Sequence, residues 1–317
     1  MASHNQTDEQ ALVALRMQDD LTRAATDGVS IVIPAYNEEQ GAPPMMQEMR
    51  ELLRKELDGL IPFEIIVVDD GSTDGTSEAL KPFEREPEFR LLRHARNRGY
   101  GAAIKTGIRY ARHRWIMITD ADGTYPAEHI PELLRAREAD GMVVGARIGE
   151  RTNVPLIRRP PKWVLRKLAE ALSGAVIPDL NSGLRVFPRE VAERFRSVLP
   201  DQFSYTTTIT LAMFAAGHAV TYLPINYRRR AGRSKIRPIA DTINFSKLII
   251  RTVLYLDPLR VFLPISTLFL VAAVIIGVGS YWLTGRVMDV TTVLLVVTGI
   301  HMLMLGMIAD MMNRRMS

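Results

Sequence analysis

Two long stretches without Asp, Glu, Lys or Arg, residues 261–285 and 290–309, constrain this chain more than any other feature. They contain 25 and 20 residues. As α-helices they would extend about 37 and 30 Å, and the hydrocarbon core of a bilayer is about 30 Å thick. The sequence therefore predicts a hairpin of two transmembrane helices within residues 259–312, at about 261–285 and 290–311. His301 lies in the second helix, where we expect a hydrogen bond between the helices rather than a transport role.

Basic residues are concentrated just before the first apolar stretch. Residues 225–260 hold nine Arg or Lys and two Asp, a net charge of +7 that exceeds the +5 of the whole chain. Such a basic composition is also typical of nucleic-acid-binding proteins. A basic collar beside a membrane span, however, more often faces anionic lipid. We therefore expect a lipid bilayer, and no nucleic acid, as a partner.

The same charges predict an orientation in the membrane. The turn between the two stretches carries one Arg and one Asp, whereas Arg314 and Arg315 follow the second stretch. Positive residues remain preferentially on the cytoplasmic side. We expect a multi-pass protein of the inner, cytoplasmic cell membrane, with the N-terminal portion and both termini in the cytoplasm. Residues 1–28 are polar and show no signal-peptide h-region, so we expect them to form a leader.

Between residues 29 and 146, short apolar runs alternate with stretches that favour helices. The apolar runs are 29–34, 63–69, 89–93, 115–119 and 142–146, and the helical stretches are 38–57, 76–83, 100–112 and 128–138. This alternation predicts an α/β fold, a Rossmann-like and mostly parallel sheet with helices on both faces. Further strands and helices follow to about Tyr227, so the sheet domain is expected to comprise residues 29–237. Ligands of such sheets bind at the carboxyl ends of the strands.

Two amphipathic segments accompany this domain. Residues 147–179 are basic, hold Pro155, Pro160 and Pro161, and include the amphipathic stretch 163–172. Residues 238–257 read as a juxtamembrane amphipathic helix, with charged Lys247 and Arg251 on one side. Such a helix can lie in the bilayer interface. Ordinary packing against the sheet domain is the alternative.

The strongest chemical signal is Asp120-Ala121-Asp122, directly after the apolar run 115–119. Two carboxylates one residue apart at a strand end can share a hard divalent cation, which takes its other ligands from water and substrate phosphates. The chain has no cysteine, which excludes a cysteine nucleophile and a cysteine-ligated metal. We therefore expect Mg²⁺ or Mn²⁺ bound by Asp120 and Asp122.

Two further strand ends carry residues suited to a nucleotide. The run 29–34 leads into Ala35-Tyr36-Asn37-Glu38, and the run 63–69 ends in Asp69 and continues with Asp70-Gly71-Ser72. An aromatic ring can stack on a base, and carboxylates can bind a ribose. Each motif alone would be an ordinary turn or helix cap. Gly99-Tyr100-Gly101 is not a dinucleotide fingerprint, because Ile104 replaces the third glycine; a turn that lets the next helix approach the sheet suffices.

These motifs, in this order, resemble family 2 glycosyltransferases with a GT-A fold. The resemblance rests on Pro-Ala-Tyr-Asn-Glu, Asp-Asp-Gly-Ser-Thr-Asp-Gly-Thr, Asn97-Arg98-Gly99-Tyr100-Gly101 and Asp-Ala-Asp. The motifs at 179–185 and 229–235 resemble the polyprenyl-phosphate glycosyltransferases, the group containing dolichol-phosphate mannose synthase and the bactoprenol glucosyltransferases. The resemblance covers about residues 29–255, and the two-helix tail is similar to that of bacterial members.

The resemblance implies roles for individual residues. Those expected to bind the nucleotide sugar are Pro34, Tyr36, Glu38, Val67, Asp69, Asp120, Ala121, Arg229 and Lys235. Those expected at the acceptor phosphate are Arg147, Ser182, Arg185, Arg229 and Ser234. Asp122, Asp179 and Arg147 are the expected catalytic residues. Asp179 would orient the acceptor or accept its proton; anchoring the Ser182–Gly183 turn is an equal alternative. Some relatives carry a glutamine where this chain has Thr124, so the third metal ligand stays open between water and Thr124.

The function implied is inverting transfer of a single hexose from a nucleotide-diphosphate sugar to undecaprenyl or dolichyl phosphate. The continuation through Pro126 resembles members that use uridine donors, which favours a UDP-sugar; a GDP-mannose-dependent synthase is the alternative. A non-catalytic nucleotide-sugar-binding scaffold is an alternative from another class. A processive synthase is disfavoured because the chain lacks Gln-x-x-Arg-Trp and further spans. Some relatives form tetramers, so we expect a homo-oligomer.

Overall fold

The structure is a computed structural model that describes residues 27–57, 60–137, 141–148, 166–167, 169–171, 174–228, 247, 249–255, 257–285 and 289–314. Contacts divide the chain into two units, which we describe separately. One comprises Met1–Pro155, Pro178–Met213 and His218–Lys235, and the other comprises Leu156–Ile177, Phe214–Gly217 and Ile236–Ser317. Nearly all of the predicted leader, the stretch 149–165 and the segment 229–246 lie outside the described residues.

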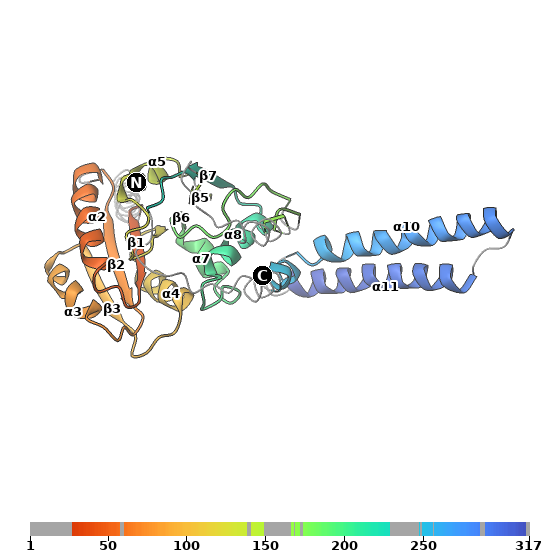
Figure 1. Cartoon of the computed structure of the whole chain (residues 1–317), viewed down its shortest axis with the longest axis horizontal. Helices are drawn as coiled ribbons and strands as arrows, with labels where there is room; N and C mark the ends of the chain where they lie inside the picture. The colour runs from red at the N-terminus through yellow and green to blue at the C-terminus, as the bar shows by residue number, and fades with distance from the viewer. Residues whose placement is uncertain are drawn as a thin grey trace, which may run out of the picture. The chain divides into compact units, whose positions relative to one another are not determined.

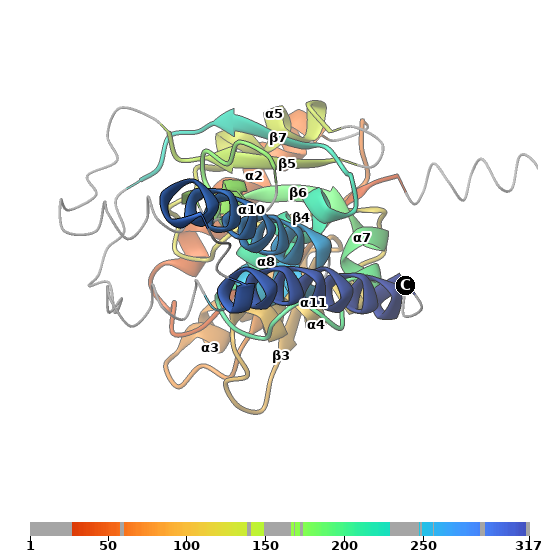
Figure 2. The same ribbon diagram turned by 90° about the vertical axis from the view of Figure 1, so that its right-hand side faces the viewer.

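The first unit is built on a seven-stranded sheet. Its strands are β1 (Val29–Ala35), β2 (Phe63–Asp69), β3 (Phe89–Arg93), β4 (Trp115–Ile118), β5 (Met142–Ala146), β6 (Arg185–Pro188) and β7 (Val220–Pro224). They lie in the order β3-β2-β1-β4-β6-β5-β7, and Figure 2 shows β7, β5, β6 and β4 following one another across the sheet. Only β6 runs antiparallel to its neighbours. The predicted mostly parallel sheet and its first five strands are confirmed.

Helices follow the strands much as the sequence predicts. They are α2 (Ala42–Leu57), α3 (Thr76–Leu80), α4 (Tyr100–Tyr110), α5 (Ile130–Arg135), α7 (Arg189–Arg194) and α8 (Tyr205–Ala215), with 3-10 turns η1 (Lys81–Arg85) and η2 (Ala127–His129). Helix α2 begins at Ala42 rather than at Glu38. The intervening residues instead form a loop whose backbone bonds to the segment after β2. The stretch predicted as one helix over 128–138 starts as η2, and Pro131 lies in the first turn of α5, where its missing N–H is tolerated.

The alternation of side chains along β1 explains why both faces of the sheet are covered. Ile31 and Ile33 belong to one buried cluster with Met49 of α2. Val32 points to the other face, where α4 packs: a Cβ at Gly107 would lie 2.3 Å from Val32 Cγ1. A glycine at this point of α4 lets its backbone approach the strand closely. The layers hold the carboxyl ends of β1, β2 and β4 in register.

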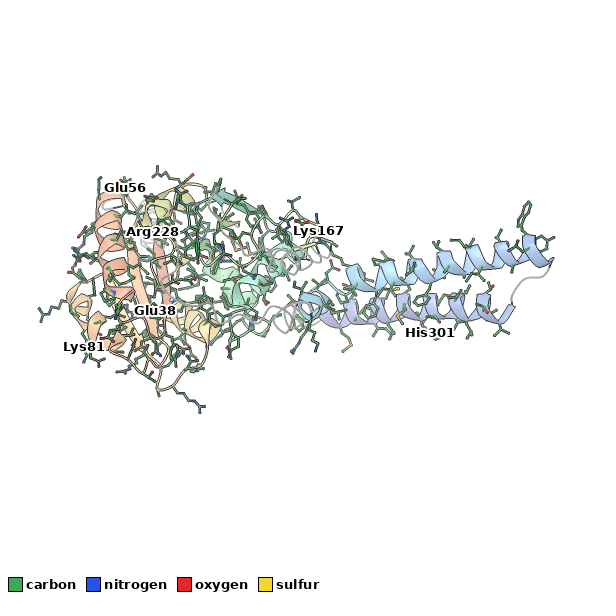
Figure 3. The ribbon with its side chains drawn as sticks, viewed as in Figure 1. Glu38, Glu56, Lys81, Lys167, Arg228 and His301 are labelled. Carbon is green, nitrogen blue, oxygen red and sulfur yellow. The ribbon has the colours of Figure 1, made fainter. Side chains whose placement is uncertain are left out.

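The second unit contains α10 (Leu259–Thr284) and α11 (Asp289–Arg314), which run side by side as an antiparallel hairpin (Figure 1). Both are long and apolar enough to cross a membrane, and only 11% of each apolar window is buried, unlike a soluble core helix. Gly299 lies against Leu270, and its carbonyl accepts a hydrogen bond of 2.7 Å from Ser266 Oγ. His301 is exposed (Figure 3), so the predicted hydrogen bond between the helices is wrong.

The predicted juxtamembrane helix is described only in part. Residues 249–255 are helical. Ile249 and Val253 are buried, whereas Arg251 is exposed. This is the one-sided burial that an amphipathic helix requires.

Candidate active site

Three loops meet at the carboxyl edge of the parallel strands. The register pairs Ala35 with Asp69 and Val32 with Ile118, so β1, β2 and β4 end beside one another. Asn37 joins the first two loops: its N–H donates to Ser72 Oγ at 3.0 Å, and its Oδ1 accepts from the N–H of Thr73 at 2.8 Å. Asn37 has a φ of 56°, a left-handed conformation that asparagine tolerates better than most residues. The loops therefore form one connected rim.

Residues predicted to bind the nucleotide sugar occupy different environments on this rim. The side chain of Tyr36 is 44% exposed, so its ring is available for stacking. Glu38 is half-buried, and a Cβ at Gly41 would lie 3.0 Å from its Oε2 and 3.6 Å from Asp122 Cα. Gly41 thus lets the Glu38 carboxylate approach the Asp122 loop. Three of the predicted residues are buried core residues that could offer a ligand only their backbone: Pro34, Val67 and Ala121.

The carboxylates of Asp69 and Asp70 are buried and hydrogen-bonded to neighbouring groups of the protein. Asp69 is fully buried and accepts hydrogen bonds from the N–H of Ser72 and from Ser77 Oγ. Asp70 Oδ1 lies 2.6 Å from His94 Nδ1, and Oδ2 accepts from the N–H of Gly99 at 2.8 Å. A direct contact between Asp69 and a nucleotide would require its carboxylate to leave these bonds. We therefore assign Asp69 to the support of the loop.

Asp120 and Asp122 present their carboxylates at the end of β4. Asp122 Oδ1 accepts from Thr124 Oγ1 at 2.6 Å and from its N–H at 3.1 Å. Asp120 Oδ1 accepts from the hydroxyl of Tyr100 at 2.9 Å. On its other side, a Cβ at Gly183 would lie 2.8 Å from Asp120 Oδ2, so a side chain there would require the carboxylate to move. Both carboxylates are half-buried and are held by neutral donors.

This pair suits a hard divalent cation. Among the residues that the structure describes, no three His, Cys, Asp or Glu side chains gather as a complete set of metal ligands. Asp120 and Asp122 offer only oxygen atoms, the ligands of Mg²⁺ and Mn²⁺. An ion held by two carboxylates would take its remaining ligands from water and phosphate. Thr124 is buried and its hydroxyl donates to Asp122; the third ligand, water or Thr124, stays a prediction.

Arg147 and Asp179 form a paired unit beside the acidic loop. Arg147 Nε donates to Asp179 Oδ2 at 2.7 Å, and Nη2 donates to Oδ1 at 2.9 Å. Burial alone would raise the pKa of Asp179, but the hydrogen bonds and charge of Arg147 outweigh it and hold that pKa below its usual value. Asp179 therefore stays ionised at neutral pH as the partner of Arg147. Its role of orienting the acceptor or accepting its proton stays a prediction.

Tyr125 connects the acidic loop to the Arg147–Asp179 pair. Its hydroxyl accepts a hydrogen bond of 2.6 Å from the N–H of Gly183, the residue beside Asp120. Its ring packs edge-on against Tyr227 at a centroid distance of 5.2 Å, and the Arg147 guanidinium lies 5.3 Å from the Tyr227 centroid. Burial and the charge of Asp120 raise the pKa of Tyr125. The phenol thus stays neutral while it fixes both sides of the site.

The structure corrects the acceptor-phosphate roles predicted for Ser182 and Arg185. Both side chains are fully buried. Ser182 Oγ donates to the carbonyl of Gly145 at 2.5 Å. The guanidinium of Arg185 donates to the carbonyls of Ser182 and Thr206, the latter at 2.8 Å. Because these donors are already bonded to backbone carbonyls, both side chains support the structure beneath the site.

The basic motif that contains Arg229, Ser234 and Lys235 lies outside the described residues, but its point of entry is defined. The N–H of Arg228 donates to the carbonyl of Thr124 at 2.9 Å. Its guanidinium, labelled in Figure 3, forms two hydrogen bonds with Glu48, of 2.8 and 2.9 Å. These contacts raise the pKa of Arg228 and lower that of Glu48. The motif therefore starts from a residue fixed to the acidic loop.

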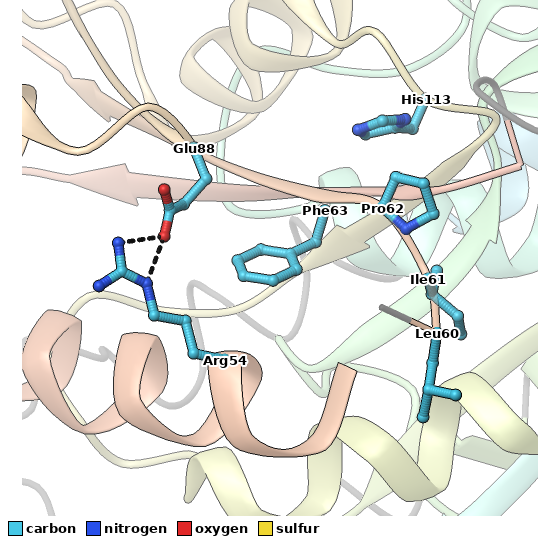
Figure 4. A pocket seen from close by; sticks show the side chains of 7 residues that line it. All are labelled: Arg54, Leu60, Ile61, Pro62, Phe63, Glu88 and His113. Carbon is cyan, nitrogen blue, oxygen red and sulfur yellow. Dashed lines mark hydrogen bonds and ion pairs between the residues drawn. The ribbon is translucent and has the colours of Figure 1, made fainter. Parts of the chain in front are cut away.

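A cavity at the opposite edge of the sheet does not belong to this site. It has a volume of about 610 Å³ and is lined by Arg54, Leu60, Ile61, Pro62, Phe63, Glu88 and His113 (Figure 4). These residues precede or begin β2, β3 and β4, so they lie at the amino ends of the strands. Arg54 is paired with Glu88 at 2.7 Å. The acidic motifs lie at the other ends of these strands.

Comparison with known families agrees with this arrangement. A family model described as Glycosyl transferase family 2 matches residues 30–196, which is more than half of the chain. The chain belongs to glycosyltransferase family 2. A second model, described as the GtrB C-terminal hairpin, matches residues 257–314, the region of α10 and α11.

Similar proteins named for their functions align with most of the chain. A dolichyl-phosphate hexose transferase of Haloferax volcanii is 29% identical over 74% of this chain and 97% of its own length. An undecaprenyl-phosphate 4-deoxy-4-formamido-L-arabinose transferase of Yersinia enterocolitica is 26% identical over 90% of this chain and 88% of its own. The crystal structure of glucosyl-3-phosphoglycerate synthase from Mycobacterium tuberculosis with Mn²⁺, UDP and phosphoglyceric acid aligns with a TM-score of 0.55. It has 21% identity and covers 74% of this chain and 80% of that one. These likenesses establish the GT-A fold.

Several residues of this family 2 site were not predicted from the sequence. Tyr100, Tyr125 and His94 hold the acidic loops. Tyr100 and Tyr125 do not stand directly at the end of a parallel strand, whereas His94 directly follows β3. Tyr125 had a signal, since it lies within the Asp-Gly-Thr-Tyr-Pro continuation. Tyr100 also had one, but a glycine-flanked tyrosine reads equally well as a turn.

Proposed function

We propose that this chain transfers a single hexose from a nucleotide-diphosphate sugar to polyprenyl phosphate at the cytoplasmic face of the cell membrane, with inversion at the transferred carbon. One observation carries the proposal: a family 2 domain with two half-buried carboxylates at the end of β4 shares its chain with a membrane-type hairpin. The relatives support it, since they are named for transfer of sugars to dolichyl or undecaprenyl phosphate.

On this proposal, Asp120 and Asp122 bind Mg²⁺ or Mn²⁺ together with the diphosphate of the donor. When bound, the ion supplies positive charge for the departing nucleoside diphosphate. Tyr36 stacks on the base, and Glu38 lies at the side of the Asp122 loop. The protein groups therefore bind and orient the donor, while the chemistry depends on charge stabilisation.

The acceptor phosphate would lie against Arg147. The pair with Asp179 uses Nε and Nη2, and among the residues that the structure describes Nη1 has no hydrogen bond and is available for a phosphate oxygen. Arg229, Ser234 and Lys235 would complete this phosphate site with charge-assisted hydrogen bonds. A phosphate monoester has a second pKa near 6, so an ionised nucleophilic oxygen is present at neutral pH. No side chain is then required as a strong base, in agreement with the ionised state of Asp179.

The donor nucleotide is proposed from the motif around Asp122 alone. Its continuation through Pro126 favours a UDP-sugar, with GDP-mannose as the alternative. A scaffold that binds a nucleotide sugar without turnover would show binding but no product.

A homo-oligomer is proposed from the resemblance and can be measured by light scattering in detergent.

The experiment is a transfer assay with the purified full chain, undecaprenyl phosphate, Mn²⁺ and separate UDP-glucose, UDP-N-acetylglucosamine and GDP-mannose reactions. We expect a lipid-linked sugar with one donor, and none with Asp122→Asn. The variant Glu78→Gln, which changes an exposed carboxylate on α3, is the matched control. Donor binding without any lipid product from the wild type would contradict the proposal and favour the scaffold.

The proposed orientation can be tested because the chain has no cysteine. Single cysteines introduced by Arg286→Cys and Ser317→Cys report the turn and the C-terminus, respectively. In intact cells, a membrane-impermeant maleimide should label the first variant and not the second. Labelling of Ser317→Cys alone would reverse the orientation.

A further inference from the structure

The motif Gly99-Tyr100-Gly101 has a clear place at the site. Tyr100 is the first residue of α4, and its hydroxyl donates to Asp120 Oδ1 at 2.9 Å. The sequence offered only a turn at this position. The contact joins a segment that follows β3 to a carboxylate that follows β4, across the rim of the sheet.

The backbone before Tyr100 is fixed by buried groups that the proposed reaction does not use. The Asp70 carboxylate accepts hydrogen bonds from the N–H groups of Arg98 and Gly99, at 2.9 and 2.8 Å. His94 contacts Asp70 through Nδ1 and Thr106 Oγ1 through Nε2, at 2.6 and 2.9 Å. Gly99 has a φ of 107°, which a residue with a side chain rarely adopts. These hydrogen bonds and the conformation of Gly99 fix the backbone position of Tyr100 at the start of α4.

A second loop fixes Tyr100 from the other side. The N–H of Ala102 donates to the carbonyl of Asp201 at 3.0 Å, and Lys105 Nζ lies 2.7 Å from Asp201 Oδ1. Phe203, in the same loop, stacks on the Tyr100 ring with a centroid distance of 5.5 Å and an interplanar angle of 18°. The ring of Tyr100 is therefore held independently of its hydroxyl.

A phenol is well suited to orient a carboxylate that must bind a cation. An arginine or lysine at this point would neutralise Asp120 and compete with a metal ion. A hydroxyl fixes one oxygen while the carboxylate keeps its negative charge. A tyrosine hydroxyl is uncharged at neutral pH, so it donates without adding positive charge beside Asp120. Such outer groups commonly set the affinity of a metal site.

We infer that Tyr100 is a positioning residue that orients the carboxylate of Asp120 toward the divalent cation of the nucleotide-bound state, with His94 and Asp70 placing it. The inference rests on the proposed function only for the identity of the cation complex. It does not require the acceptor, the lipid or turnover. It can therefore be tested by a binding measurement, without any sugar transfer.

The test measures Mn²⁺ binding by electron paramagnetic resonance, with the full chain in detergent and with UDP and GDP in separate titrations. Tyr100→Phe keeps the ring and its stack on Phe203 and removes only the hydroxyl. We expect it to weaken Mn²⁺ binding about 10- to 100-fold, the usual effect of losing a group that orients a metal ligand. Tyr110→Phe makes the same change at the exposed far end of α4, and we expect it to bind Mn²⁺ like the wild type.

A double-mutant cycle separates orientation of Asp120 from a general structural role. In an Asp120→Asn background, Tyr100→Phe should cause little further loss, because the two groups act through one contact. Unchanged Mn²⁺ affinity in Tyr100→Phe, an additive loss in the double variant, or no Mn²⁺ binding by the wild type with either nucleotide would each overturn the inference. Weakened binding in Tyr100→Phe together with the absence of lipid product from the wild type would uphold it while refuting the proposed transfer.

Discussion

Two pairs of aspartates stand at neighbouring strand ends and differ in what surrounds them. Asp69 and Asp70 follow β2 and are almost completely buried. Their oxygens accept hydrogen bonds from the backbone of their own loop and from the loop before α4. Asp120 and Asp122 follow β4 and are only half-buried. Asp120 accepts a hydrogen bond from the hydroxyl of Tyr100, and Asp122 accepts from the hydroxyl and the N–H of Thr124.

This difference distinguishes a structural role for Asp69 and Asp70 from a ligand-binding role for Asp120 and Asp122. A buried carboxylate that accepts several hydrogen bonds organises the chain around it, and removing it leaves donors unsatisfied. A half-buried carboxylate held by a neutral hydroxyl keeps its charge available to a cation. Similar motifs at equivalent strand ends thus have different consequences when they are changed.

The largest effect is expected from the pair after β4. Asp122→Asn should lower the transfer rate about 1,000-fold, because the cation that neutralises the leaving diphosphate loses a charged ligand. The unfolding free energy should change by less than about 1 kcal/mol, as at most positions outside the core. Initial rates and urea unfolding of the same preparation measure the two quantities. If Asp122→Asn were stable and fully active, the proposed difference in role between the two pairs would be wrong.

Changing the pair after β2 should instead lower the unfolding free energy strongly. Asp70→Ala removes the acceptor for the N–H groups of Arg98 and Gly99 and the partner of His94. We expect a loss of about 3 kcal/mol in unfolding free energy, since each buried donor left unsatisfied costs about 1–3 kcal/mol. Urea denaturation of the full chain in detergent measures it. An unfolding free energy within about 0.5 kcal/mol of the wild type, the usual range for surface substitutions, would contradict this assignment.

Arg147 allows the comparison to be sharpened with a further acid, the half-buried Asp179, which is paired with a guanidinium in addition to backbone N–H donors. Arg147→Lys keeps the charge but loses the two-point geometry to Asp179. We expect kcat/KM for the polyprenyl phosphate to fall about 30-fold, from the loss of roughly 2 kcal/mol in a charge-assisted contact. The KM of the donor should be unchanged. An effect confined to the donor would place Arg147 at the diphosphate instead.

The smallest expected effect is on the pH dependence of stability. Asp179 has a pKa lowered by Arg147, so its contribution to stability is complete above the ordinary aspartate pKa of about 3.9 and is lost as pH falls toward the lowered value. The difference in unfolding free energy between the wild type and Asp179→Asn should therefore be constant near neutral pH and shrink below about pH 4. Urea unfolding across this range measures it. A difference that grows on acidification would have the wrong sign.

Much of the fold could be predicted because its signals are local. The apolar runs that became β1 to β5 alternate with amphipathic stretches, and periodicity reports such elements directly. The acidic motifs could also be placed on one edge, since the carboxyl ends of parallel strands meet there. The two apolar stretches predicted α10 and α11 from length and charge alone.

The remaining features depend on contacts between distant residues. The resemblance implied that Arg185 lies at the acceptor phosphate, but its guanidinium donates to the carbonyls of Ser182, which precedes β6, and of Thr206 in α8. Tyr100 reaches Asp120 only because the Asp70 carboxylate fixes the loop before it. His301 turned outward, since the packing of Gly299, not periodicity, determines which side of α11 faces α10. Burial and pairing of this kind cannot be read from spacing.

The central claim is that the carboxylates after β4 hold the cation of a nucleotide-sugar complex. It is tested most directly by titrating Mn²⁺ into the wild type and Asp122→Asn in the presence of the nucleoside diphosphate that the wild type binds, with electron paramagnetic resonance as the readout. We predict saturable Mn²⁺ binding by the wild type and its loss in Asp122→Asn, at unchanged thermal stability. Equal Mn²⁺ affinity in the two proteins would contradict the account.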